Sequence, residues 1–95
     1  MAHSKQMEKD VIELTNALGV SGHEENVTKI VKAKLSKIPG LKYEKDNLGS
    51  LAAIKKGKGG AKAPTISIVA HMDEVGFMLT NITSTGFLKF EPLGG

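Results

Sequence analysis

His71, Asp73 and Glu74 are the residues whose types and spacing indicate chemistry. They follow residues 66–70, an apolar and β-branched run typical of a buried strand, and a second apolar run over residues 75–79 comes directly after them. Because α/β proteins place their sites at the ends of strands, a functional site is expected here. Residues two apart on a strand share a face, so the sequence predicts that His71 and Asp73 lie side by side.

An imidazole beside a carboxylate is the usual arrangement of a metal-binding histidine, since the carboxylate fixes the tautomer of the ring and raises its basicity. This pattern indicates His71 as a metal ligand and Asp73 as the residue that orients it. A histidine bonded to a neighbouring aspartate for structural reasons alone is the alternative that the triplet leaves open. Glu74 is a lesser candidate ligand, because strand alternation points it away from His71.

The composition limits the classes of protein that this sequence can encode. With no cysteine among the 95 residues, any metal must be held by nitrogen and oxygen, and a reducing cytoplasmic location is expected. All 13 basic residues are lysines, and the lack of arginine and tryptophan argues against nucleic-acid binding. No apolar run approaches the roughly 20 residues of a membrane span, so no membrane partner is expected.

Two amphipathic helices are predicted in the first forty residues. A polar tail over residues 1–4 precedes the first helix, which spans residues 5–18, and Gly19 supplies its C-cap. The second helix ends at the Pro-Gly pair of residues 39–40. Four lysines on or beside its polar side predict a solvated helix face: Lys29, Lys32, Lys34 and Lys37.

Ser21 and Glu24 open the second helix with the spacing of a capping box. In that arrangement the serine hydroxyl and the glutamate carboxylate each satisfy a backbone N–H that the helix leaves unpaired. A structural role is therefore expected for both residues in preference to catalysis. His23 lies in the same turn, and we expect it to be exposed or packed locally rather than to bind metal.

Five strands are expected after the helices, over residues 41–46, 51–56, 66–70, 75–79 and 87–91. The first two form an antiparallel hairpin around the turn at residues 47–50. The glycine- and lysine-rich residues 57–62 form a flexible connection, because a phosphate-binding loop requires Gly-Lys-Ser/Thr leading into a helix. The sequence thus predicts an α/β fold in which two helices pack on one face of a mixed sheet.

Four segments in order carry a family resemblance: Gly-Val-Ser-Gly-His-Glu-Glu at residues 19–25, Asp-Asn-Leu-Gly at 46–49, Ala-His-Met-Asp-Glu-Val-Gly-Phe at 70–77, and residues 86–95. The third is the specific one. Together they resemble the N-terminal part of the glutamyl/deblocking aminopeptidases, a family of di-metal peptidases with some members named endoglucanase M or cellulase. The resemblance implies that residues 1–95 are an incomplete zinc-peptidase-like (phosphorylase/hydrolase-like) catalytic domain, truncated before an inserted β-rich domain.

The resemblance also implies a function. The parent protein would remove N-terminal residues from peptides with two divalent metal ions, zinc or cobalt, that polarise the scissile carbonyl and activate a bridging water. By position, His71 matches a metal ligand of the family and Asp73 matches the carboxylate of the catalytic site that orients it. A catalytic zinc needs about three protein ligands, and the family's other ligands lie downstream, so the chain alone is expected to be inactive.

Oligomerisation is a further expectation. Members of the family assemble into homo-oligomeric dodecamers, and this chain is expected to associate with itself through exposed sheet edges. Two other function classes stay open. The chain can be a small α/β interaction module or subunit without catalysis. A glycoside hydrolase needs two facing carboxylates, whereas Asp73 and Glu74 are adjacent on a strand and point in opposite directions.

Overall fold

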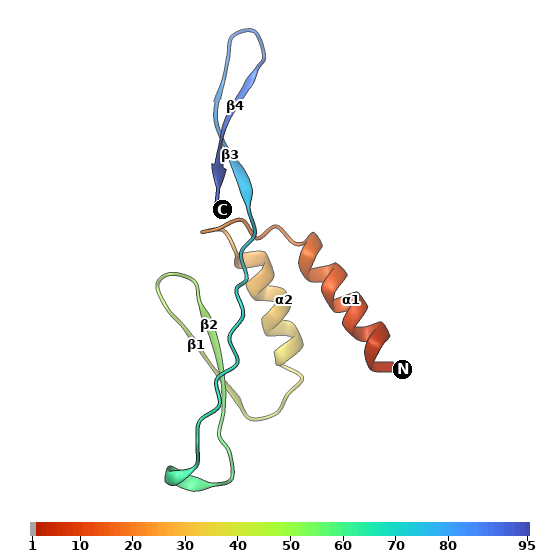
Figure 1. The fold of residues 1–95 in the computed structure, drawn as a ribbon, viewed down its shortest axis with the longest axis vertical. Helices are drawn as coiled ribbons and strands as arrows, with labels where there is room; N and C mark the ends of the chain where they lie inside the picture. Colours follow the sequence, from red (N-terminus) through yellow and green to blue (C-terminus); the bar gives the residue numbers. More distant parts are fainter. Residues whose placement is uncertain (1) are drawn as a thin grey trace.

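Two helices and two hairpins make up the chain, for which a computed structural model describes residues 2–95, with side chains from Ser4 onward (Figure 1). The elements are α1 (Ala2–Asn16), α2 (Glu25–Leu35), β1 (Leu41–Lys45), β2 (Leu51–Lys55), the short 3-10 helix η1 (Gly60–Lys62), β3 (Gly76–Ile82) and β4 (Leu88–Leu93). The strands form two separate antiparallel pairs, β1–β2 and β3–β4. The α/β class is confirmed, whereas the prediction of one mixed sheet is wrong.

The predicted strand over residues 66–70 accounts for this difference. Figure 1 shows it inside a long trace, without helix or strand, that leads from η1 to β3. Its apolar side chains lie in solvent, and Ile68 is 95% exposed. A strand is defined by the neighbour that takes its hydrogen bonds, and none of the described strands pairs with this segment. We refer to residues 64–70 as the extended segment.

The helices also differ from the prediction at their beginnings. Helix α1 begins at Ala2, so the expected polar tail is helical from that residue, and Met1 lies outside the described part. Helix α2 begins at Glu25 with Glu24 as its N-cap, and no side chain caps it. The predicted capping box is therefore wrong, because the Ser21 hydroxyl bonds elsewhere.

Lys34 is an exception to the predicted solvated lysine face. Its Nζ lies 2.8 Å from Asp10 Oδ1 and also pairs with Glu13, so it joins α2 to α1. These contacts raise the pKa of Lys34 through the hydrogen bonds that it donates to Asp10 and then to Glu13. Lys32 behaves differently, since its Nζ lies over the Tyr43 ring at 5.4 Å from the centroid. In Figure 1, α2 accordingly lies between α1 and the β1–β2 hairpin.

Both hairpins form at turns that the sequence marks. Asp46 Oδ1 accepts hydrogen bonds from the backbone N–H groups of Leu48 and Ser50, at 2.9 and 2.8 Å, and closes β1–β2. In the β3–β4 turn, Thr83 Oγ1 accepts from the Phe87 N–H at 2.9 Å. Asx and Ser/Thr turns of this kind replace backbone bonds that a tight turn cannot make. The predicted hairpin over residues 41–56 is confirmed.

The molecule is elongated, with extents of 65 × 35 × 20 Å and a radius of gyration of 18.3 Å. A compact domain of this length has a radius of gyration of about 12 Å. The accessible surface is 8472 Å², against about 5,300 Å² for a folded monomer of this mass. Among the described side chains, Val27 is the one apolar group classed as buried, at 6% exposure.

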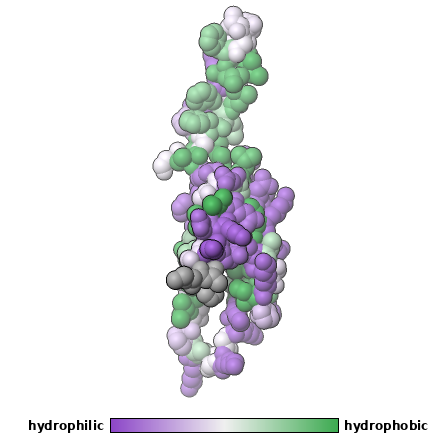
Figure 2. Space-filling view, turned by 90° about the vertical axis from the view of Figure 1, so that its right-hand side faces the viewer, coloured by the Kyte–Doolittle hydropathy of each residue, from purple (hydrophilic) through white to green (hydrophobic). Residues whose placement is uncertain are grey.

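Many large apolar side chains lie on this surface. Figure 2 shows hydrophobic residues gathered over the upper part of the molecule, where Figure 1 places the β3–β4 hairpin, and hydrophilic residues over the middle. Within that hairpin the Phe77 and Phe90 rings meet edge to face at 5.0 Å, yet both side chains remain more than half exposed. Monomeric proteins seldom expose contiguous apolar surface of this extent. Further protein is therefore expected to cover it.

Candidate metal-binding site

The candidate site lies where the loop between α1 and α2 runs beside the segment that leads into β3. Glu74 N donates to Gly19 O at 2.8 Å, and Val20 forms a parallel bridge with Glu74. A Cβ on Gly19 would lie 2.7 Å from Val27 Cγ2 and 3.2 Å from Met72 O, so this close approach requires glycine. We call residues 19–21 together with residues 72–76 the junction.

His71 and Asp73 lie together at one end of the junction, as the spacing predicts. His71 Nδ1 is 3.1 Å from Asp73 Oδ1 and 3.0 Å from Asp73 O. The histidine side chain is 86% exposed and that of the aspartate 42%. Because both Asp73 acceptors engage Nδ1, that nitrogen carries the proton when the ring is neutral, and Nε2 is the nitrogen that can bind a metal.

Ser21 brings a third side chain to this pair. Its hydroxyl donates to Asp73 Oδ2 at 2.6 Å, across 52 positions of sequence. The pKa of Asp73 is lowered, first by this hydrogen bond from Ser21 and second by the one from His71, because both stabilise the carboxylate. Glu24, the other residue of the expected capping box, instead accepts the Gly22 N–H at Oε1, at 2.7 Å.

The remaining candidates, His23 and Glu74, donate backbone hydrogen bonds to Val20 and Gly19 rather than to this pair. His23 is exposed, as expected, and its N–H donates to Val20 O at 2.8 Å. Glu74 is exposed and joins the junction through its main chain. Within residues 4–95, no three histidine or acidic side chains gather as a complete metal-binding group. The described residues thus bring one imidazole beside one carboxylate and form no complete metal site.

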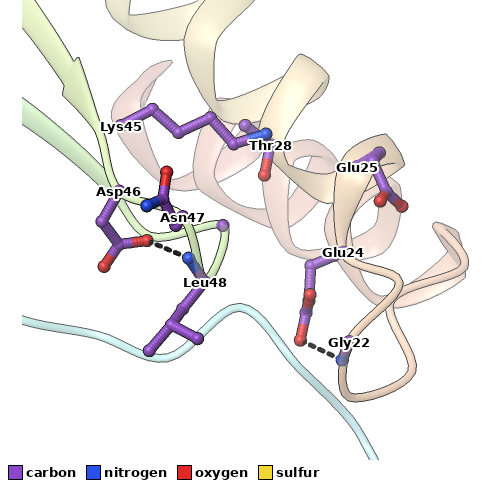
Figure 3. Close-up of a pocket in the computed structure, with 9 residues that line it drawn as sticks. Gly22, Glu24, Glu25, Thr28, Lys45, Asp46, Asn47 and Leu48 are labelled. Atoms are coloured by element: carbon purple, nitrogen blue, oxygen red, sulfur yellow. Dashed lines mark hydrogen bonds between the residues drawn. The ribbon is translucent and has the colours of Figure 1, made fainter.

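A separate hollow of about 230 Å³ lies between the start of α2 and the β1–β2 turn (Figure 3). Two of its acidic side chains accept hydrogen bonds from backbone N–H groups: Glu24 from Gly22, and Asp46 from Leu48. The hydrogen bonds from Ser50 lower the pKa of Asp46. His71 is not among the residues that line this hollow, so the hollow is not part of the candidate site.

Comparison with known proteins identifies the family. Residues 49–95, which include His71 and Asp73, match the model of the M42 glutamyl aminopeptidase family. The chain is 40% identical over 82 residues to glutamyl aminopeptidase of Lactococcus lactis, which covers 86% of this chain and 22% of that protein. The chain belongs to the M42 glutamyl aminopeptidase family.

Other members confirm the match and show its extent. The lysyl aminopeptidase of Pyrococcus furiosus is 34% identical over 77 residues, which cover 81% of this M42 chain and 21% of the relative. A TET aminopeptidase from a marine sediment archaeon, Thaumarchaeota archaeon SCGC AB-539-E09, superposes with a TM-score of 0.84 at 33% identity. That superposition covers 98% of this chain and 25% of the archaeal one. The M42 chain therefore spans about a quarter of the length of the proteins it matches.

Sequence reasoning missed Ser21 as part of the site. The family match begins at residue 49, so Ser21 lies outside the matched range. The signal available in the sequence is Gly22 directly after it, since glycine favours a turn over a helix start; in the structure Gly22 has a positive φ of 85°. The described residues also contain no helix long and apolar enough to cross a membrane.

Proposed function

We propose that the protein containing this chain is a metal-dependent aminopeptidase that removes N-terminal residues from peptides. The observation that carries the proposal is the His71–Asp73 pair, held at the junction of a chain that belongs to the M42 family. The relatives are named glutamyl and lysyl aminopeptidases, which supports peptides as the substrates. The absence of cysteine supports a cytoplasmic location.

His71 would hold one of two divalent ions, zinc or cobalt, through Nε2. The donor set fits this role, because the imidazole is exposed and its other nitrogen faces the Asp73 carboxylate at 3.1 Å. When bound, such ions polarise the scissile carbonyl and lower the pKa of a bound water. Asp73 keeps the ring in one orientation and stabilises the proton on Nδ1.

Residues 1–95 would form the N-terminal part of the catalytic domain, and the remaining ligands would come from outside these residues. The surplus of about 3,000 Å² in accessible surface supports this proposal, since it is of the size that permanent interfaces bury. The 95 residues alone would be inactive, because one imidazole cannot hold a catalytic ion. In the absence of the remainder, the apolar surface would pair with a second copy of the chain. Within the whole protein we propose homo-oligomers, a suggestion that the TET neighbour supports.

Two preparations test this function with amino-acyl p-nitroanilides and added zinc or cobalt. One is the 95-residue chain, and the other is the Lactococcus glutamyl aminopeptidase with its matching segment replaced by this chain. The proposal predicts turnover by the chimera and none by the chain. A folded chimera without activity would contradict it, as would turnover by the 95 residues that is lost on His71→Ala.

A further inference from the structure

The Asp73 carboxylate has two partners, one on each oxygen. Oδ2 accepts the Ser21 hydroxyl at 2.6 Å, and Oδ1 lies 3.1 Å from His71 Nδ1. The partners come from different parts of the chain, and only His71 is a neighbour of Asp73 in sequence. A carboxylate bonded at one oxygen alone can still turn about its side-chain torsions, whereas bonds at both oxygens fix its plane.

We infer that Ser21 is a positioning residue: its hydroxyl anchors Asp73 so that the carboxylate holds the His71 ring with Nδ1 protonated and Nε2 turned to the metal. This inference rests on the proposed function for its purpose, since the free Nε2 matters only if a metal binds there. It adds to the histidine and aspartate of the site a residue from the α1–α2 loop. Ser21 itself touches neither metal nor substrate in this account.

The exposure of the pair explains why an anchor is needed. His71 is 86% exposed and Asp73 42%, so packing alone does not hold either side chain. A hydrogen bond between exposed groups contributes little by itself, because water can replace either partner. Ser21 is better held, because the junction bond from Glu74 N to Gly19 O fixes the loop two residues before it.

The backbone at Gly94 also lies beside the Ser21 hydroxyl. A Cβ added to Gly94 would lie 3.4 Å from Ser21 Oγ and 3.5 Å from Val75 Cγ1, so the backbone of residue 94 passes beside the hydroxyl. Ser21 and Asp73 are both intermediate in exposure, and their bond is partly buried. A hydrogen bond to a charged group is stronger where water is partly excluded. The Ser21–Asp73 bond is therefore suited to fix the aspartate.

A rival holder of the ring is the backbone carbonyl of Asp73, which lies 3.0 Å from Nδ1. This carbonyl would keep the proton on Nδ1 without help from the carboxylate or from Ser21. The two accounts predict different results when the hydroxyl alone is removed. Under the rival account the tautomer of His71 does not change, and under ours it becomes mixed.

The tautomer is measured directly by nitrogen NMR of the His71 ring in the ¹⁵N-labelled chain, without metal and well above the ordinary histidine pKa of about 6.5. We expect widely separated Nδ1 and Nε2 shifts with the proton on Nδ1. In Ser21→Ala the two shifts should converge, as the ring exchanges between tautomers. Ser21→Thr keeps a hydroxyl and should restore the wild-type separation.

Two further variants separate the hydrogen bond from folding. Ser21→Cys keeps a side chain of similar size, but its thiol donates only weakly, so its His71 shifts should converge as in Ser21→Ala. If Ser21→Ala does not fold, Ser21→Cys provides the test. Ser36→Ala is the matched control, since its hydroxyl bonds Ala33 O at 2.7 Å at the end of α2, and it should leave the His71 shifts unchanged.

Three results would overturn the inference: mixed tautomers in the wild type, unchanged shifts in folded Ser21→Ala and Ser21→Cys, or equal changes in Ser36→Ala. The proposed function can fail separately. A single tautomer that depends on Ser21, together with an inactive chimera, would refute the peptidase proposal and retain the positioning role.

Discussion

The junction and the extended segment are adjacent in sequence and differ sharply in how they are held. Residues 72–76 have a neighbouring backbone, with Glu74 bonded to Gly19 and bridged to Val20. Residues 64–70 are more apolar, yet they have no strand partner in the described structure and their side chains are exposed. Apolar sequence therefore makes a segment able to form a strand, while an available partner decides whether it does.

The same contrast separates the two hairpins. The β1–β2 hairpin lies beside α2, with Lys32 over the Tyr43 ring. The β3–β4 hairpin projects from the molecule with its phenylalanines half or more exposed. A lone two-stranded hairpin has little stability in water, so β3–β4 and the extended segment are the parts that most need a covering partner.

The largest expected effect is on self-association through the extended segment. Ile68→Lys should shift the chain toward monomer, because each copy in a dimer would lose the burial of an isoleucine, worth about 1.5–3 kcal/mol. Since Ile68 is 95% exposed, the fold of the single chain should not change. Sedimentation velocity over a concentration series measures the shift.

Leu48→Lys is the control for that change. Leu48 is similarly exposed but belongs to the β1–β2 turn and not to the extended segment, so its replacement should leave association intact. A wild-type chain that stays monomeric throughout the series would contradict the prediction of self-association.

The next effect tests the junction. Gly19→Ala places a methyl group 2.7 Å from Val27 Cγ2, and overpacking of this kind costs about 1–3 kcal/mol. We expect a lower free energy of unfolding in urea and loss of the slow amide exchange of Glu74. Gly57→Ala is the matched control, because a Cβ there meets nothing within 4 Å. Equal stabilities for the two variants would show that the close approach at Gly19 is not required.

The smallest effect concerns the β1–β2 turn in acid. Hydrogen bonds from Ser50 hold the pKa of Asp46 below its usual 3.8, so the carboxylate stabilises the folded hairpin at neutral pH. This contribution is lost as the pH falls below 3.8 and through the lowered folded-state pKa. Amide exchange at Leu48 and Ser50, corrected for the intrinsic rate at each pH, should therefore become faster in acid.

Asp46→Asn tests whether the Asp46 carboxylate causes this acid response, since an amide oxygen still accepts the two backbone hydrogen bonds but does not titrate. In this variant the exchange rates, corrected for intrinsic chemistry, should not depend on pH. Glu44→Gln removes a carboxylate from the neighbouring strand and should leave the wild-type acid response. An acid response that persists in Asp46→Asn would place its origin elsewhere.

The sequence predicted those parts of the fold that local patterns decide. Asp46 and the glycine three residues later mark the β1–β2 turn, and periodic apolar residues mark both helices. The alternation of residues 71 and 73 correctly placed His71 beside Asp73. Each of these predictions depends on residues within a few positions of one another.

The rest depends on neighbours that are distant in sequence or outside these residues. The mixed sheet was wrong because the strand at residues 66–70 has no partner among the described strands. Ser21 was read as a helix cap, since local spacing cannot reveal that Asp73 is its partner 52 positions away. The prediction that Lys34 is solvated was likewise wrong, because Lys34 forms an ion pair with Asp10 of α1.

The most direct test of the account is the metal content of the chimera described above, with His71→Ala compared against His23→Ala. Both residues are exposed histidines, so the pair separates a metal ligand from a surface imidazole. We predict that His71→Ala loses bound zinc and at least about a hundredfold in peptide hydrolysis, while His23→Ala keeps both. Full metal content and activity in His71→Ala would contradict the central claim that His71 is a metal ligand.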